Sequence, residues 1–217
     1  AIGWTSQTTV VKINEIEYRA RIIGLEHDYF KGLDKTVGIT FELETAIKDN
    51  DGNNWSTLWE VPGTEAKSTD FPGSRFNELL NNEIYNAFDY SVRPYIKEVD
   101  KKVAVTKQFV VNTYPTFLFS LSATELKINS SHHAKNEGTP YGFYQLHTED
   151  ADRIKKDLDG NAVIYWTRSP QIDDHGSSWP PAPNEHAGVI KDNGQIDNYW
   201  IWGNVARSQC VIPAFCI

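Results

Sequence analysis

The first part of the chain alternates apolar with polar side chains, which is the pattern of strands that bury one face. Residues 10–13 and 18–23 follow it, and the polar pair Asn14 and Glu15 lies between them, so we predict a β-hairpin. Residues 38–43 alternate in the same way and predict a further strand. Apolar residues within 103–111 predict a strand or a strand pair.

Residues 75–88 carry the clearest helical pattern. Ser74 precedes them and is a suitable N-cap. The apolar positions fall on one face at helical spacing, and they are Phe76, Leu79, Leu80, Ile84, Ala87 and Phe88. A second, shorter helix is predicted over residues 149–158, capped by Thr148, because acids come early and lysines late.

Residues 117–121 form an apolar run that predicts a buried strand. Ser122 and Glu125 follow it at capping-box spacing and predict one helical turn. Residues 48–69 and 129–147 are polar or rich in Gly and Pro, and we expect loops there. Few helices, many short strands and long loops favour an α+β fold in a single domain, residues 1–217.

Composition narrows the class of protein. The chain has 217 residues, of which 40% are hydrophobic, so it can bury a full core. Its formal net charge of -8 and the absence of a basic stripe argue against nucleic acid as a partner. No apolar run reaches about 18 residues, so we expect no membrane insertion. Methionine is absent, position 1 included, which suggests a processed chain or a piece of a longer one.

Residues 165–217, here called the cassette, begin and end in segments that look like buried strand. Between them Trp179, Tyr199, Trp200 and Trp202 lie among Asn, Asp, His, Gly and Pro. Rigid aromatic area beside adaptable hydrogen-bonding groups is typical of recognition surfaces. We therefore expect residues 1–164 to be scaffold and the cassette to bind a ligand.

Several segments together carry a resemblance to a known family. They are Arg75-Phe76-Asn77-Glu78-Leu79-Leu80-Asn81, Phe117-Leu118-Phe119-Ser120-Leu121-Ser122 with Glu125, Tyr165-Trp166-Thr167-Arg168-Ser169-Pro170, Gly194-Gln195-Ile196 and Pro213-Ala214-Phe215-Cys216-Ile217. The chain resembles the C-type-lectin-like domains of phage tail and receptor-binding proteins and bacterial surface proteins, which include variable proteins of diversity-generating retroelements. The family usually has Arg directly before the Pro-Ala pair, where this chain has Ile212.

The resemblance implies a C-type-lectin-like fold with a loop-rich C-terminal half and a fixed scaffold that carries variable positions. It implies a virion, extracellular or cell-surface location and a protein or glycan receptor as the partner. Assembly into a homo-oligomer is compatible with it. The expected ligand-binding residues have no packing logic in the sequence, and they are Asp173, Asp174, His175, Trp179, Asn184, Glu185, His186, Tyr199, Ile201, Trp202, Asn204, Arg207 and Gln209.

Other residues of the cassette favour structural roles. Arg168, between Trp166 and Pro170, is expected to be internal and to donate hydrogen bonds to loop carbonyls, with ligand contact as the alternative. Trp166 and Phe215 are expected in the core. Family spacing favours display of Tyr199 and burial of Trp200, while Trp202 stays undecided. Cys210 and Cys216 lie about 20 Å apart if the segment between them is extended, so we expect two thiols rather than a disulfide.

Candidate chemistry is sparse. The acids and histidines at 173–175 and 185–186 match no zinc or calcium spacing, so we expect neither a metal nor another cofactor. No Gly-x-Ser-x-Gly motif and no Cys–His pair at useful spacing are present, and we expect no enzyme. The alternatives are a glycan-active enzyme and a purely structural virion module. Buried acids with perturbed pKa values converging in one cleft would favour the enzyme.

Overall fold

A computed structural model describes residues 3, 7–59, 71–105, 110–129, 133, 135–171, 186–200 and 208–217. Its strands are β1 (Thr8–Ile13), β2 (Ile16–Leu25), β3 (Tyr29–Phe30), β4 (Ile39–Leu43), β5 (Ser56–Thr57), β6 (Val99–Val105), β7 (Val110–Thr116), β8 (Leu118–Phe119), β9 (Lys155–Lys156), β10 (Ala162–Val163), β11 (Tyr165–Gln171), β12 (His186–Ile190), β13 (Ile196–Trp200), β14 (Gln209–Cys210) and β15 (Ala214–Cys216). Its helices are η2 (Phe71–Gly73), α1 (Arg75–Glu78), η3 (Leu79–Ile84), α2 (Tyr85–Ala87), η4 (Arg93–Tyr95), α3 (Gly142–Leu146) and η6 (Asp150–Arg153). Mostly antiparallel sheets with few short helices make this an α+β fold, as predicted.

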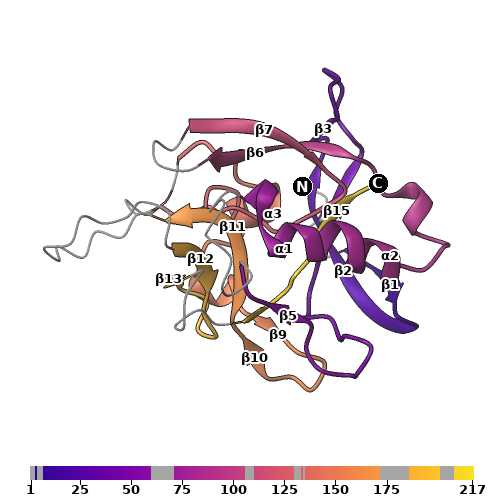
Figure 1. Cartoon of the computed structure of the whole chain (residues 1–217). Coiled ribbons are helices and arrows are strands. Elements are labelled where there is room, and N and C mark those ends of the chain that lie inside the picture. Colours follow the sequence, from indigo (N-terminus) through magenta and orange to yellow (C-terminus); the bar gives the residue numbers. More distant parts are fainter. Residues whose placement is uncertain are drawn as a thin grey trace, which may run out of the picture.

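Two five-stranded sheets dominate the fold (Figure 1). In the first, of order β1-β2-β4-β15-β8, the last strand of the chain pairs with β4 on one side and β8 on the other. In the second, of order β13-β12-β11-β14-β5, all pairs are antiparallel except β11 with β14. A three-stranded sheet, β3-β6-β7, and the pair β10-β9 complete the topology of the described residues.

The N-terminal hairpin forms as predicted. β1 and β2 pair in register from Thr8↔Arg21 to Ile13↔Ile16. Asn14 and Glu15 both have positive φ, 49° and 61°, which is the backbone shape that a two-residue hairpin turn with the sheet's own twist requires. Burial also follows the alternation, since Val11, Ile13, Tyr18 and Ala20 are in the core.

The predicted helix is one continuous stretch, α1–η3–α2, with a π-helical middle. The Ser74 hydroxyl accepts a hydrogen bond from the Asn77 amide at 3.1 Å, so the predicted N-cap is confirmed. The stretch lies in front of β2 and β15 in Figure 1, and Phe88, just past its end, packs edge-on against Phe215 of β15. The predicted face is buried apart from the half-buried Ala87.

The second predicted helix is wrong in extent. Only η6 forms, capped by Glu149 rather than Thr148, and the chain then turns into β9 and β10. Tertiary contacts outweigh helix propensity here, because the buried Lys155 ammonium points inward to the Glu42 carboxylate at 2.7 Å. The expected loop at 129–147 also contains a short helix, α3, and that at 48–69 contains β5.

The buried hydrophobic residues form two clusters, and each contains residues from both halves of the chain. Trp166 of β11 meets Trp59 edge-on with ring centroids 5.5 Å apart, and Phe76 of α1 packs on Trp59 at the same centroid distance. Trp166 and Phe215 are both fully buried, as predicted. Cys210 and Cys216 are free thiols, which agrees with the sequence expectation.

Candidate functional site

The cassette leaves its sheet at one place. Gln171, the last residue of β11, pairs with His186, the first of β12, and His186 pairs with Trp200, the last of β13. These three strand ends therefore lie side by side at one end of the sheet. Residues 172–185 connect β11 to β12, and residues 201–207 follow β13, so both connections start from this end.

The predicted ligand-binding residues concentrate in those two connections. Ten of them lie outside the described residues: Asp173, Asp174, His175, Trp179, Asn184, Glu185, Ile201, Trp202, Asn204 and Arg207. The backbones of His186 and Tyr199 are placed at the strand ends, Tyr199 opposite Ala187, while their side chains and that of Trp200 are not among those described.

Gln209 differs from the rest of the predicted set. It lies in β14, which is enclosed between β11 and β5, and it pairs with Thr57. Its side chain is only 6% exposed, so it offers little surface to a ligand. No packing role for Gln209 was evident in the sequence, but the residue lies in the interior of a sheet.

Arg168 anchors β11 from inside the molecule. Its side chain is fully buried and donates to the backbone carbonyls of Ser120 at 2.8 Å, Glu137 at 3.2 Å and Lys102 at 3.3 Å. It also pairs with the Glu125 carboxylate at 2.6 Å. Since a guanidinium has five N–H donors in a fixed fork, this residue ties three segments to one strand. The prediction of an internal arginine that bonds loop carbonyls is confirmed.

Glu125 links the arginine to a second buried cation. Its carboxylate accepts the Ser122 amide at 3.2 Å while the Ser122 hydroxyl accepts the Glu125 amide at 3.1 Å, so the predicted capping box is present. The other carboxylate oxygen lies 2.7 Å from the Lys101 ammonium. Burial opposes ionisation of Glu125, but Arg168 and Lys101 outweigh it and lower its pKa.

Lys101 uses all of its donors within the protein. Besides Glu125 it bonds Asp28 at 2.5 Å and the Tyr141 hydroxyl at 2.8 Å, and its ammonium lies over the Phe119 ring. Although burial alone would raise it, the pKa of Asp28 is held well below its usual range, chiefly by Lys101. Sequence reasoning did not identify this lysine. The available signal was its spacing in β6, because Lys101 is two residues from both Val99 and Val103 and therefore lies on the same inward face of the strand.

Arg168, Lys101, Asp28, Glu125 and Glu137 together form a buried network. Of its three acids, only Glu137 has a raised pKa. Its carboxyl group accepts the Ala104 amide at 2.9 Å and lies 2.5 Å from the Ser169 hydroxyl. Burial raises its pKa from 4.5 to about 7, although Arg168 acts in the opposite direction. The group therefore stays protonated through mildly acidic pH and ionises near neutrality.

The raised pKa of Glu137 predicts a pH-dependent stability. Between pH 4.5 and about 7 the unfolded chain releases this proton while the folded chain keeps it, so the free energy of unfolding should fall as pH rises. The full effect is about 3 kcal/mol. Glu137→Gln keeps an oxygen that accepts the Ala104 amide and has no ionisable group, so we expect it to gain stability relative to the parent from pH 4.5 to 7.5.

Urea denaturation of both proteins across this pH range measures the difference. Glu17→Gln, which removes an exposed carboxylate, is the matched control and should follow the parent. Equal pH profiles for the parent and Glu137→Gln would mean that Glu137 is already ionised in the folded protein.

The buried carboxylates of Asp28 and Glu125 are both held in ion pairs. A cavity of about 190 Å³ reaches the cluster and is bordered by His27, Asp28, Lys101 and Glu125. Asp28 and Glu125 are both engaged by Lys101, which suits a structural ion-pair network better than a general acid and base. Among the described residues, no three His, Cys, Asp or Glu side chains are grouped as a metal site.

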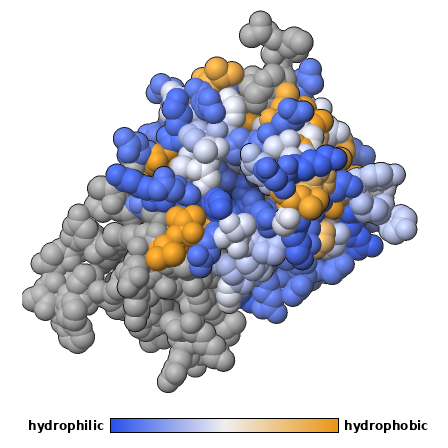
Figure 2. All heavy atoms as spheres, turned by 90° about the horizontal axis from the view of Figure 1, so that it is seen from above, coloured by the Kyte–Doolittle hydropathy of each residue, from blue (hydrophilic) through white to orange (hydrophobic). Residues whose placement is uncertain are grey.

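The exposed hydrophobic side chains of the described residues do not point to a further binding site. On the face in Figure 2, hydrophobic side chains form small separate groups among hydrophilic ones. The most exposed of the large hydrophobic residues are Tyr90, Leu146 and Leu33. They lie in different parts of the chain, and isolated exposed apolar residues are normal for a globular protein.

Comparison with known proteins gives a family and no further relative. No curated protein and no solved structure matches the chain. A family model described as "Domain of unknown function (DUF6273)" matches residues 51–217, more than half of the chain, including β11–β15 and all the predicted ligand-binding residues. The chain therefore belongs to the DUF6273 family.

Proposed function

We propose that this protein recognises a ligand through the cassette, as a receptor-binding or adhesion protein of a phage or a bacterial surface. The observation that carries the proposal is the set of adjacent strand ends at Gln171, His186 and Trp200. Both connections that hold the aromatic, polar and charged residues singled out in the sequence start there. Binding residues are typically carried on loops that a rigid scaffold positions.

We also propose the finer fold, a C-type-lectin-like domain of the kind found in variable proteins of diversity-generating retroelements. It is supported by the last strand, β15, pairing with the N-terminal sheet through β4. The second sheet contains the other strands of the cassette, β11 to β14. In this interpretation residues 1–164 are scaffold, and the sequence variation is confined to residues 172–207.

The mechanism is preorganised binding. Arg168 and Ser169 fix β11 to the Ser122 turn and to Glu137 by buried bonds, and Trp166 fixes it to the core. A strand held in this way loses little conformational entropy when a ligand binds next to its end. Aromatic and arginine side chains on the connections then supply the few contacts that dominate the binding energy.

The proposed partner is a protein or glycan receptor on a cell surface, reached from a virion, an extracellular or a cell-surface location. Nucleic acid does not suit a chain of net charge -8. The described residues contain no helix that is both long and apolar enough to cross a membrane. Several copies in a homo-oligomer would multiply the affinity of a single cassette.

The experiment applies labelled protein to an array of surface glycans and receptor ectodomains. We expect the parent to bind at least one array target and Tyr199→Ala combined with Arg207→Ala to bind it at least tenfold more weakly, because aromatic and arginine contacts are each worth about 2 kcal/mol or more. The melting temperature should hardly change.

The matched control removes the same residue types outside the cassette. Tyr90→Ala combined with Arg19→Ala changes two exposed side chains and should bind as the parent does. Equal loss of binding in both double variants, or unfolding of the cassette variant, would refute recognition through the cassette.

A second candidate is an enzyme acting on surface glycans, and one observation favours it. Three buried acids, Asp28, Glu125 and Glu137, converge on one network beside a cavity. The engagement of two of them by Lys101 makes this the weaker candidate. If the parent releases reducing ends from a panel of polysaccharides and Glu137→Gln does not, the enzyme becomes the better-supported function.

A further inference from the structure

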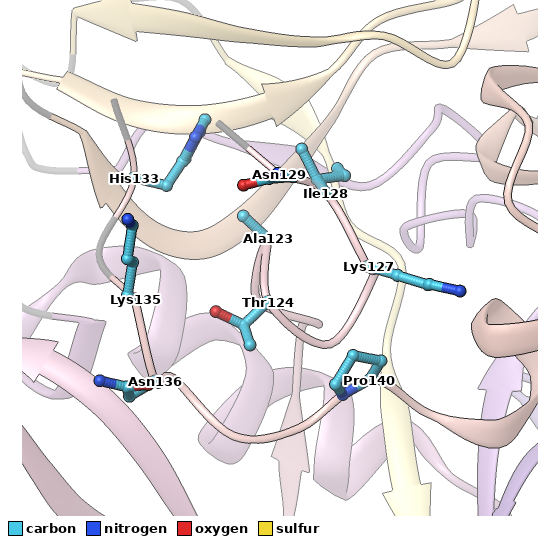
Figure 3. A pocket seen from close by; sticks show the side chains of 9 residues that line it. All are labelled: Ala123, Thr124, Lys127, Ile128, Asn129, His133, Lys135, Asn136 and Pro140. Atoms are coloured by element: carbon cyan, nitrogen blue, oxygen red, sulfur yellow. The ribbon is translucent and has the colours of Figure 1, made fainter. Parts of the chain in front are cut away.

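A separate cavity of about 320 Å³ lies against the Ser122 turn (Figure 3). One wall is the segment from Ala123 to Asn129, and the other is formed by His133, Lys135 and Asn136. This volume is at the lower end of the range for small-molecule sites. Its described lining lies within residues 123–140, which precede the cassette in the chain.

The lining has the chemistry of an anion site. Its described residues include two lysines, a histidine, two asparagines and a threonine, and none of these described residues is Asp or Glu, in a chain where acids outnumber bases 29 to 21. In Figure 3 the side-chain oxygens of Asn129 and Thr124 face the space that Lys135 borders, while the His133 ring points toward the sheet and Lys127 points away. Lys127 instead donates to the Gln145 carbonyl at 3.3 Å, so among the described lining residues Lys135 is the lysine left to serve as a counter-charge.

The walls are held in place by the buried network. The Ser122 hydroxyl donates to the Glu137 carbonyl at 2.7 Å, which joins the two walls. The Ala123 amide donates to Ser169 of β11 at 2.8 Å. Beneath the cavity, the carboxylate of Glu125 is neutralised by Arg168 and Lys101. A preformed cavity with a facing ammonium binds an anion at a low cost in ordering entropy.

His133 fixes the position of this cavity relative to the sheet. It is buried, and a methyl group placed on Gly188 of β12 would lie 3.3 Å from its ring nitrogen. The cavity therefore adjoins the strand that begins at His186, without sharing a residue with it. Close packing of the histidine on a glycine keeps this wall against the sheet.

We propose that this cavity binds a small ligand through an anionic group, a carboxylate or a phosphate, with Lys135 as the counter-charge. The Thr124 hydroxyl and the amide group of Asn129 supply further donors. The volume admits a group no larger than about one acidic sugar or one phosphate ester. The inference does not depend on the proposed function of the cassette.

The test is titration of the full chain with three anionic probes, glucuronic acid, N-acetylneuraminic acid and inorganic phosphate, followed by NMR or calorimetry. N-acetylglucosamine is the uncharged control. We expect binding of at least one anion, which identifies a carboxylate or phosphate source, and weaker binding at higher salt. Lys135→Gln should weaken it at least tenfold without changing the melting temperature.

Two control variants distinguish binding in this cavity from binding elsewhere on the protein. Lys12→Gln, which removes an exposed lysine on β1, should bind the anion as the parent does. Tyr199→Ala with Arg207→Ala should also leave it unchanged, so that failure of the cassette proposal is distinguishable. The inference is overturned if the parent binds none of the anions, binds the uncharged sugar equally well, or binds unchanged after Lys135→Gln.

Discussion

Replacing Arg168 by Met is expected to lower the free energy of unfolding by about 3–5 kcal/mol, the cost of leaving a buried ion partner uncompensated. The Glu125 carboxylate would keep only Lys101 as an ion partner, and the carbonyls of Ser120, Lys102 and Glu137 would each lose the donor that Arg168 supplies. Urea denaturation measures the loss.

Two further variants make the Arg168 result specific. Arg168→Lys keeps the charge but not the planar fork of donors, so it should be intermediate. Arg75→Met removes a partly exposed arginine that pairs with Glu78 and Glu83, and it should cost about 1 kcal/mol or less. If Arg168→Met costs no more than Arg75→Met, the buried network does not hold β11.

Trp166→Ala is expected to cost about 3–5 kcal/mol, because it empties a large volume in the shared core. The indole is fully buried, meets Trp59 edge-on and donates to the Thr57 carbonyl at 2.8 Å. Chemical denaturation is again the measurement. Trp166→Phe keeps an aromatic ring and loses that bond, so it should cost less. A harmless Trp166→Ala would mean that core and display are assigned the wrong way round.

These two side chains show what local sequence patterns can predict. Burial of Trp166 followed from its place on a run that looks like inner strand, and the internal role of Arg168 followed from its apolar neighbours. The hairpin, the capped helix and the capping box at Ser122 were also predictable, because each depends on residues only a few positions apart.

The partners of Arg168 were not predictable in the same way. Glu137 lies 31 residues from it in sequence, and Asp28 lies 73 residues from Lys101. Their contacts arise from chain crossings that no short window contains. Lys101 on an otherwise apolar strand face was a local sign of a buried charge, but it gave no indication of which acid would pair with it.

The failure at residues 149–158 has the same origin. The charge order favours a helix, and η6 does form at its start. Lys155, however, is drawn inward by Glu42 of β4, and the Asp157 carboxylate then accepts the amides of Asp159 and Asn161 in the β9–β10 turn. A buried ion pair and a side-chain-stabilised turn outweigh a weak local preference.

The buried network gives the proposed recognition surface its physical basis. A strand that is fixed by Arg168, Ser169 and Trp166 keeps its end in place whatever residues follow it. Changes beyond Gln171 and Trp200 should therefore alter binding without altering the fold. We therefore expect stability and recognition to depend on different residues.

Two libraries displayed on cells can show whether stability and recognition depend on different residues. One randomises cassette residues Asp173, His175, Glu185, Asn204 and Arg207, and both are scored for protease resistance and for selection of binders to immobilised streptavidin. Surface substitutions usually change stability by no more than about 0.5 kcal/mol, so most members of this library should resist protease as the parent does.

The second library randomises the same number of positions within β11, from Tyr165 to Ser169, which are all buried. We predict that its members are mostly cleaved and yield no binders, whereas the library of residues 173–207 stays folded and yields streptavidin binders. If the library of residues 173–207 is cleaved as extensively as the β11 library, or stays folded without yielding binders, stability and recognition are not separated in this way.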